Sequence, residues 1–274
     1  MYIDSHAHLF DEVFKQDLRD VVARARDAGI DTIVVPATTV ETSHEAIELA
    51  EQFDFVYACV GIHPHEARTA TENDLAKIEL LSHHRKVVAI GEIGLDFHYD
   101  FTPRDVQEEV FRLQITIAIQ RNLPIVVHTR ESMAEALSIV EAMVVKHPTW
   151  RQHNPYAERG AIVGRGVFHC FSGTTTDATR LFGAGFFVSY PGIVTFKKSP
   201  VAETLEDIGY QNILVETDSP YMAPEPMRGK RNEPANIVHI GQKVAALFDI
   251  SEQELAEVTS TNARRLFAIE KDSP

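Results

Sequence analysis

The sequence predicts a (β/α)8 barrel, the TIM-barrel fold, as a single domain over residues 1–270. Eight short apolar and β-branched runs alternate with segments of helical periodicity, which favours a parallel sheet covered by helices. The 274 residues, 44% of them hydrophobic, are enough for one large core. A doubly wound open sheet is the structural alternative, but no glycine-rich nucleotide-binding fingerprint supports it.

Eight strands are expected from these runs, each bounded by turn residues. They cover residues 2–8, 31–36, 55–61, 87–92, 124–128, 166–170, 185–189 and 213–218. The stretch from 146 to 164 interrupts the alternation with prolines, a tryptophan and several charges. It leads from a helix into a strand, which in a barrel places it opposite the catalytic end. We therefore expect a surface excursion there and a candidate contact site.

Residue patterns typical of helices and of helix ends lie between the predicted strands. Apolar residues recur at i, i+3, i+4 and i+7 from Leu18, and Gly29 ends the pattern. A threonine and a proline at 102–103 have the order of a cap and a first-turn proline. Ser251 and Glu254 have the spacing of a capping box. These signals predict amphipathic helices.

The charge balance disfavours one broad class of partner. The chain has 26 lysines and arginines against 40 aspartates and glutamates, a formal net charge of −14. Such a charge opposes nonspecific binding to nucleic acid or anionic membranes, so any phosphate contact must be local. No apolar run reaches the roughly 18 residues of a membrane-spanning helix. No heptad or long exposed apolar stripe indicates an obligate protein partner.

The two cysteines and the first residues bear on the compartment. Cys59 and Cys170 lie in apolar, strand-like runs, where buried core thiols are expected rather than a disulfide framework. The chain opens on Met1 and Tyr2 without a basic leader region. These features predict a soluble cytoplasmic protein.

Ionisable residues gather at the ends of the predicted strands. His6 and His8 are two positions apart on the first strand, so both imidazoles point the same way. The other strand ends carry Glu92, His128, His169 and Asp218. Burying such groups unpaired is costly, and a shared bound cation supplies a reason for all of them. The alternative is a set of separate, hydrogen-bonded core groups.

Six candidate ligands exceed what one four-coordinate ion uses, so we expect two divalent ions. Glu92 would bridge them, with His6 and His8 on one ion and His128 and His169 on the other. Asp218 would complete the site and take a proton from the attacking water, which makes Glu92 and Asp218 the catalytic candidates. Imidazole-rich sites suit Zn or Mn better than Ca, but the identity stays open among Mg, Mn and Zn.

The motifs at these positions resemble those of the TatD deoxyribonucleases. They are His6-Ala7-His8, Gly61-Ile62-His63-Pro64-His65, Gly91-Glu92-Ile93-Gly94-Leu95-Asp96, Pro124-Ile125-Val126-Val127-His128, Phe168-His169-Cys170-Phe171-Ser172-Gly173 and Glu216-Thr217-Asp218-Ser219-Pro220, followed by residues 228–234 and 262–267. The resemblance covers nearly the whole chain. It implies a TIM barrel of the amidohydrolase superfamily that cleaves DNA with bound divalent metals, often as a 3′-to-5′ exonuclease. The family's ligands match the same six residues, with Glu92 where many superfamily relatives have a carboxylated lysine.

Secondary positions point to substrate contacts. His63 and His65 follow the third strand and either hydrogen-bond a phosphate or shape the loop. Asp96 either orients a ligand imidazole or caps a turn. Basic residues at strand ends favour a phosphate-rich substrate, with ordinary solvated surface charge as the alternative. They are Arg130, Lys197, Lys198, Arg228, Lys230 and Arg231, and the aromatic residues Tyr221 and Phe97 either stack on a base or pack.

Three hypotheses follow. The first is a metal-dependent deoxyribonuclease with DNA as its substrate, favoured by basic groups beside the predicted metal cluster. The second is a hydrolase of another ester or amide, because barrel and metals are shared across many chemistries. The third is a non-catalytic binding module, which predicts lost ligands and is opposed by the complete set of six.

Overall fold

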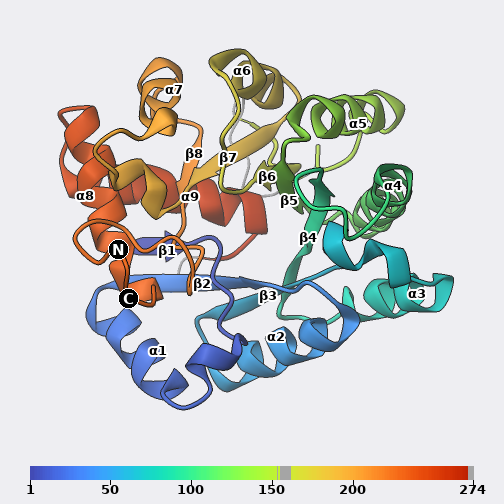
Figure 1. The fold of residues 1–274 in the computed structure, drawn as a ribbon, viewed down its shortest axis with the longest axis horizontal. Coiled ribbons are helices and arrows are strands. Elements are labelled where there is room, and N and C mark those ends of the chain that lie inside the picture. Colours follow the sequence, from blue (N-terminus) through green and yellow to red (C-terminus); the bar gives the residue numbers. More distant parts are fainter. Residues whose placement is uncertain (153, 155–161, 271–274) are drawn as a thin grey trace.

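Eight parallel strands pair with their sequence neighbours in the order β1 to β8 (Figure 1). The strands are β1 (Tyr2–Asp4), β2 (Ile30–Pro36), β3 (Val56–Val60), β4 (Val87–Asp96), β5 (Ile125–Arg130), β6 (Gly166–Phe168), β7 (Phe186–Tyr190) and β8 (Ile213–Val215). This computed structural model describes residues 1–152, 154 and 162–270. The continuous apolar character of the strands suits a parallel sheet that is buried on both faces. The predicted TIM barrel is confirmed.

The barrel closes just beyond the ends of β1 and β8. Ala7 and Ser219 form an isolated parallel bridge. Around it, the amide of Asp218 donates to the carbonyl of His6 at 2.9 Å, and the amide of His8 donates to the carbonyl of Ser219 at 2.8 Å. The segments that carry predicted ligands therefore also form the seam of the barrel.

Helices surround the strands (Figure 1). They are α1 (Leu18–Asp27), α2 (Val40–Gln52), α3 (Glu72–Leu81), α4 (Arg104–Arg121), α5 (Met133–Lys146), α6 (Thr175–Gly183), α7 (Pro200–Ile208), α8 (Ile237–Leu247) and α9 (Glu252–Phe267). One core lies between strands and helices. A second core has one residue from each strand, and two from β4, and it includes Leu266 and Phe267 of α9, so α9 packs against the barrel interior.

Strand ends differ from the predictions by a few residues. β1 ends at Asp4, so His6 and His8 lie past it rather than on it. β4 continues to Asp96, which leaves Glu92 inside the strand. His169 and Asp218 follow β6 and β8 instead of ending them. Short backbone stretches beyond the regular ladder carry these side chains, and periodicity alone does not locate such ends.

Two predicted helix caps are only partly correct. Pro103 is itself the N-cap residue of α4, while the hydroxyl of Thr102 donates to the carbonyl of His65 at 2.9 Å. Ser251 accepts from the amide of Glu254 at 3.1 Å, as in a capping box. The Glu254 carboxylate, however, accepts from a tyrosine hydroxyl at 2.8 Å instead of closing the box. A tertiary contact has replaced the local one in each case.

The stretch from 146 to 164 falls partly outside the described residues, at 153 and 155–161. Its described part is mixed: residues 146, 148, 149 and 152 are exposed, whereas Trp150 and Arg151 are buried. Trp150 donates to the carbonyl of Leu123 at 2.9 Å, and Arg151 donates to the carbonyls of Gly164 and Leu266. These partners precede β5 and β6 or belong to α9, so this part lies at the amino end of the barrel. The expected position opposite the catalytic end agrees with these contacts, and the expected surface excursion is wrong for buried residues such as Trp150 and Arg151.

The structure also bears on the two cysteines and on the hydropathy of the helices. Cys59 is buried in the barrel core, as expected. Cys170 is a free thiol as well, but it is only half-buried, with its Sγ 3.8 Å from the sulfur of Met222. Among the described residues, no helix is long and apolar enough to cross a membrane.

Candidate metal centre

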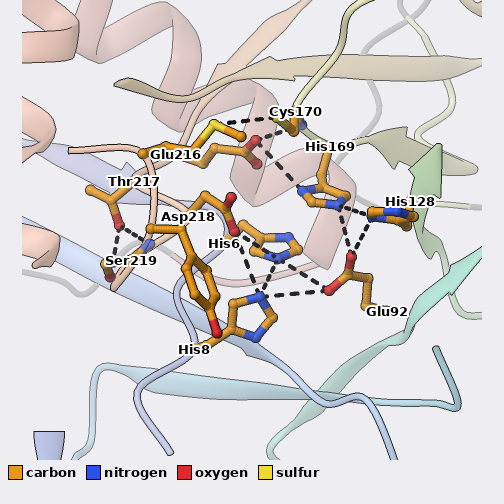
Figure 2. Close-up of polar contacts among 12 residues, drawn as sticks. His6, His8, Glu92, His128, His169, Cys170, Glu216, Thr217, Asp218 and Ser219 are labelled. Carbon is orange, nitrogen blue, oxygen red and sulfur yellow. Dashed lines mark hydrogen bonds and ion pairs between the residues drawn. The ribbon is translucent and has the colours of Figure 1, made fainter. Parts of the chain in front are cut away.

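A cleft of about 730 Å³ opens at the carboxyl ends of the strands. It is lined by His8, Phe10, Asp11, Thr38, His63, His65, Glu66, Glu92, Asp96, Tyr99, His128, Arg130, His169, Asp218 and Tyr221. Five of the six predicted ligands are in this lining. The sixth, His6, is fully buried behind them and stacks on His169 with ring centroids 4.0 Å apart. The structure thus brings all six together (Figure 2).

Four of these side chains form one donor group. Nε2 of His6 lies 3.2 Å from Nε2 of His8, and each nitrogen is 3.5–3.6 Å from Oε2 of Glu92. Both nitrogens are also 3.6–3.7 Å from Oδ1 of Asp218. Ligands at about 2.1 Å from a tetrahedral ion would be about 3.4 Å apart. The observed separations match this spacing.

A second donor group faces the other oxygen of the same carboxylate. Oε1 of Glu92 lies 2.8 Å from Nε2 of His169 and 3.0 Å from Nδ1 of His128. The two imidazole nitrogens are 3.3 Å apart, and Nε2 of His63 is 3.5 Å from the same oxygen. Glu92 therefore offers one oxygen to each group, which is the arrangement expected of a bridging ligand.

Burial sets the charge state of the first group. Burial and the neighbouring His6 lower the pKa of His8 to about 3, so this imidazole is neutral and can offer a lone pair. Burial raises the pKa of Asp218 to about 6, although His6 and His169 oppose the rise. A neutral imidazole beside a carboxylate is the protonation pattern that metal coordination requires.

In the second group, the pKa values of Glu92 and His169 are shifted in opposite directions. Burial alone would raise the pKa of Glu92, but His169, His63 and His128 hold it well below its usual value. The pKa of His169 is correspondingly raised well above normal, because Glu92 and Glu216 outweigh burial. A cation bound here would replace the His169 proton as the counter-charge of Glu92.

The donor set fits divalent metal ions. Nε2 of His6 and Nε2 of His8 lie 3.2 Å apart, and Nδ1 of His128 and Nε2 of His169 lie 3.3 Å apart. Facing imidazole nitrogens cannot all satisfy one another, since each neutral ring has one donor and one acceptor. Shared cations resolve this conflict. Three overlapping groups of possible ligands are found among the described residues, formed by His6, His8, His63, Glu92, His128, His169 and Asp218.

Carboxylates behind the ligands hold them in place. Oδ2 of Asp96 lies 3.1 Å from Nε2 of His128 and 2.9 Å from Nε2 of His65, which supports the expected orienting role of Asp96. Glu216 is buried 3.8 Å from Nδ1 of His169 and accepts from the amide of Cys170 at 2.6 Å. Sequence reasoning assigned Glu216 no role, although its place two residues before Asp218 was a usable signal.

Asp4 supports the opposite side. It is fully buried and accepts from the Thr217 hydroxyl at 2.6 Å and from the Thr217 amide at 2.9 Å. Burial raises the pKa of Asp4 to about 7 despite these hydrogen bonds. Asp4 thereby joins the segment that leads to His6 with the segment that leads to Asp218. It was not predicted, because its partner is far away in the sequence.

Two buried glutamines on α4 fix the loops that follow β3 and β4. Gln114 accepts from the amide of Ile62 at 2.8 Å and donates to its carbonyl at 2.9 Å. Gln107 makes the same pair of contacts with Asp96, at 2.8 and 2.9 Å. Sequence reasoning missed both glutamines, although polar residues one heptad apart on the apolar face of a helix are a recognisable signal.

The predicted substrate-binding residues separate into two sets. His63, His65 and Arg130 line the cleft. Arg228, Lys230 and Arg231 do not. Arg231 donates to both carboxylate oxygens of Asp17, at 2.8 and 2.7 Å, and to the Val13 carbonyl. The guanidinium of Arg231 therefore joins two loops.

The remaining predicted contacts also divide. Arg228 lies over the ring of Phe196 and 3.8 Å from Glu225. Lys197 and Lys198 are exposed beside Phe196 and do not line the cleft. Tyr221 lines the cleft, whereas Phe97 is buried beneath Arg104. The packing alternative therefore holds for Phe97.

An eight-stranded barrel with imidazoles and carboxylates clustered at its carboxyl end defines the class of metal-dependent barrel hydrolases. The family model of the TatD-related DNases matches residues 3–268. The chain therefore belongs to the TatD family.

Relatives with the same architecture span nearly the whole chain. The uncharacterized metal-dependent hydrolase YabD of Bacillus subtilis (strain 168) is 41% identical over 271 residues, which are 98% of this chain and 100% of YabD. The 3′-5′ ssDNA/RNA exonuclease TatD of Edwardsiella piscicida is 32% identical, with 97% and 99% covered. The crystal structure of YjjV, a TatD homologue from Escherichia coli K12, superposes with a TM-score of 0.86 at 26% identity, with 98% of each chain covered.

Proposed function

We propose that this metal-dependent hydrolase is a deoxyribonuclease that removes nucleotides from the 3′ end of single-stranded DNA. The observation that carries the proposal is the position of Glu92, which offers one carboxylate oxygen to each of two donor groups. His6, His8 and Asp218 would hold one divalent ion with Glu92. His128 and His169 would hold the second. Mg, Mn or Zn would be the ion, and cytoplasmic DNA the substrate.

Two ions held there would stabilise charge on the attacking and leaving oxygens of an in-line phosphoryl displacement. The other roles belong to the chain. Asp218 lines the cleft with a pKa raised by burial to about 6, and it would accept the proton of the attacking water. Arg130 and His65 line the same cleft and would orient the phosphate.

Nucleic acid as substrate is supported by the relatives. The Edwardsiella protein that matches over 97% of this chain is named as an exonuclease acting 3′-5′ on single-stranded DNA and RNA. The cleft also suits the end of one strand, because its volume is that of a site for a drug-sized ligand. Only Arg130 in its lining carries a fixed positive charge, so affinity would depend on the metal centre more than on a basic surface.

A second candidate is the hydrolysis of a smaller ester or amide. Besides Glu92, Asp96 and Asp218, the carboxylates of Asp11 and Glu66 lie in the cleft lining, and Arg228, Lys230 and Arg231 lie outside it. This balance of charge is less favourable to a polyanion than the sequence indicated. The same test separates the two candidates.

The test is digestion of end-labelled single-stranded DNA by metal-stripped protein resupplied in turn with Mg, Mn and Zn. His128→Ala would be compared with His83→Ala, since His83 is an exposed histidine outside the cleft. We expect metal-restored shortening from the 3′ end that His128→Ala loses and His83→Ala keeps. Measured binding of two ions with no cleavage under any metal would reject the nuclease and favour the smaller ester or amide.

A further inference from the structure

Two exposed aromatic rings, Tyr99 and Tyr221, line the cleft, and a third, Phe101, stacks on Tyr99. Among the described residues only Tyr99, Phe101 and Tyr221 are aromatic and exposed, with 40%, 56% and 54% of their surface accessible. Tyr99 and Phe101 lie on the loop after β4, and Tyr221 lies on the loop after β8. Leaving large rings in water forgoes the free energy of burying them. Their placement around one cleft therefore points to a ligand.

Tyr99 and Phe101 form a stacked pair. Their ring centroids are 5.1 Å apart and their planes differ by 18°. The Arg130 guanidinium lies over the Tyr99 ring at 4.8 Å. The edge of His65 meets both rings, at 5.5 Å for Tyr99 and 4.9 Å for Phe101. These contacts fix the orientation of the pair and leave much of its surface open to solvent.

The pair is connected to the metal centre through one carboxylate. Oδ2 of Asp96 contacts the ligand candidate His128 and also His65, the residue whose edge supports both rings. Oδ1 of Asp96 accepts from the amides of His98 and Tyr99, at 3.0 and 3.4 Å. Asp96 therefore links the segment that carries the rings to the ligand candidate His128.

Tyr221 differs from this pair. Its hydroxyl donates to Oδ2 of Asp11 at 3.1 Å, and its ring meets the edge of His8 at 6.0 Å. These contacts tie Tyr221 to the first donor group. The contacts of Tyr99 and Phe101 given above come instead from His65 and, for Tyr99, from Arg130.

We propose that Tyr99 and Phe101 form a stacking platform for a nucleobase of the strand being cleaved, next to the phosphate held at the metal centre. The platform rests on the proposed nuclease function and goes beyond it by naming the positioning subsite. Every base has a π-face, so the platform would accept all four bases. It would require an unpaired base, because a base inside a duplex is already stacked on both sides.

The test uses a substrate without the stacking group. Two single-stranded oligonucleotides of the same sequence would be compared, one with a normal 3′-terminal nucleotide and one with an abasic residue there. For the wild type, the abasic end should raise KM on the order of tenfold with little change in kcat. The double variant Tyr99→Ala/Phe101→Ala should show the same rise on the normal substrate and no further rise on the abasic one.

Two further variants control for side effects. Tyr99→Leu/Phe101→Leu keeps apolar surface without rings and should behave like the alanine pair. Leu80→Ala removes a side chain on α3 that is 72% exposed and should change neither substrate's kinetics. Circular dichroism would establish that each variant is folded.

The outcomes separate the platform from the nuclease itself. Cleavage by the wild type with an equal KM for both oligonucleotides would overturn the platform and leave the nuclease intact. The same conclusion would follow if the double alanine or double leucine variant still had a higher KM for the abasic oligonucleotide than for the normal one. Failure of the wild type to cleave either oligonucleotide under any metal would overturn both.

Discussion

The two ends of the barrel bury charge in opposite ways. At the amino end the buried charges are cations that meet backbone carbonyls: Lys86 donates to the carbonyls of Asp54 and Val56, and Arg151 to those of Gly164 and Leu266. At the carboxyl end, imidazoles and carboxylates face one another across 2.8–3.7 Å.

The difference separates stability from function. A backbone carbonyl can satisfy a buried cation without any ligand, so these contacts at the amino end need only the folded chain. At the carboxyl end, imidazole nitrogens face one another at 3.2 Å (His6 and His8) and 3.3 Å (His128 and His169), an arrangement that a bound cation would satisfy. We therefore expect variants at the carboxyl end to change activity and variants at the amino end to change the free energy of unfolding.

Glu92→Ala, at the carboxyl end, should have the largest effect on activity. Removing the carboxylate common to both donor groups should lower kcat on the order of a thousandfold or more. The free energy of unfolding of the metal-free protein should change by roughly 1 kcal/mol or less, because His169 can become neutral. Rates on labelled DNA, metal content by mass spectrometry and urea unfolding would measure these effects. Retained activity would remove Glu92 from the bridging position.

Arg151→Ala should produce the reverse pattern. It leaves several buried carbonyls without a donor, which should cost about 2–4 kcal/mol of stability. The melting temperature should fall by roughly 5–10 °C, while kcat per folded molecule stays unchanged. Arg151→Lys keeps the charge but loses the planar guanidinium, so its stability should lie between that of the wild type and that of Arg151→Ala. A drop in kcat at full folding would show that the two ends are not independent.

Arg130→Ala sharpens the comparison within the carboxyl end. Losing the one arginine of the cleft lining should raise KM for DNA roughly fivefold and lower the slope of affinity against salt by about one. Arg228→Ala should weaken capture in the same direction but less, since Arg228 lies outside the lining. Steady-state kinetics at several salt concentrations would check this order, and a larger effect for Arg228 would reverse it.

Arg231→Ala should have the smallest effect. Its guanidinium is engaged by Asp17 in a largely exposed pair, so about 0.5–1 kcal/mol of stability should be lost. KM for DNA should stay within twofold of the wild type. Thermal unfolding and kinetics on the same preparation would measure both, and a severalfold rise in KM would return Arg231 to the substrate path.

The sequence was most informative where the pattern was local. Alternating apolar runs located all eight strands, because buried parallel strands are apolar throughout. The six ligand candidates followed from their places at the ends of these runs. His6, His8 and Asp218 were nonetheless placed on strands that end sooner, because the ends of short strands depend on pairing with a neighbour.

The parts that sequence reasoning missed depend on contacts between distant segments. The contact of Asp4 with Thr217 joins positions 213 apart. The pairing of Arg231 with Asp17 likewise depends on how two loops fold towards each other. Tyr99 and Phe101 gave no periodic signal, and only their exposure in the fold distinguishes them from core aromatics. Such information becomes available only when the barrel has closed.

The seam between β1 and β8 connects the candidate metal centre with the closure of the barrel during folding. The backbone bonds that close the barrel at His6, His8, Asp218 and Ser219 join the first residues of the chain to its last third. Contacts of such high sequence separation carry the largest loop-closure entropy and form late. A metal ion held by His6, His8 and Asp218 would cross-link this junction, so it would slow unfolding by resisting the opening of the seam.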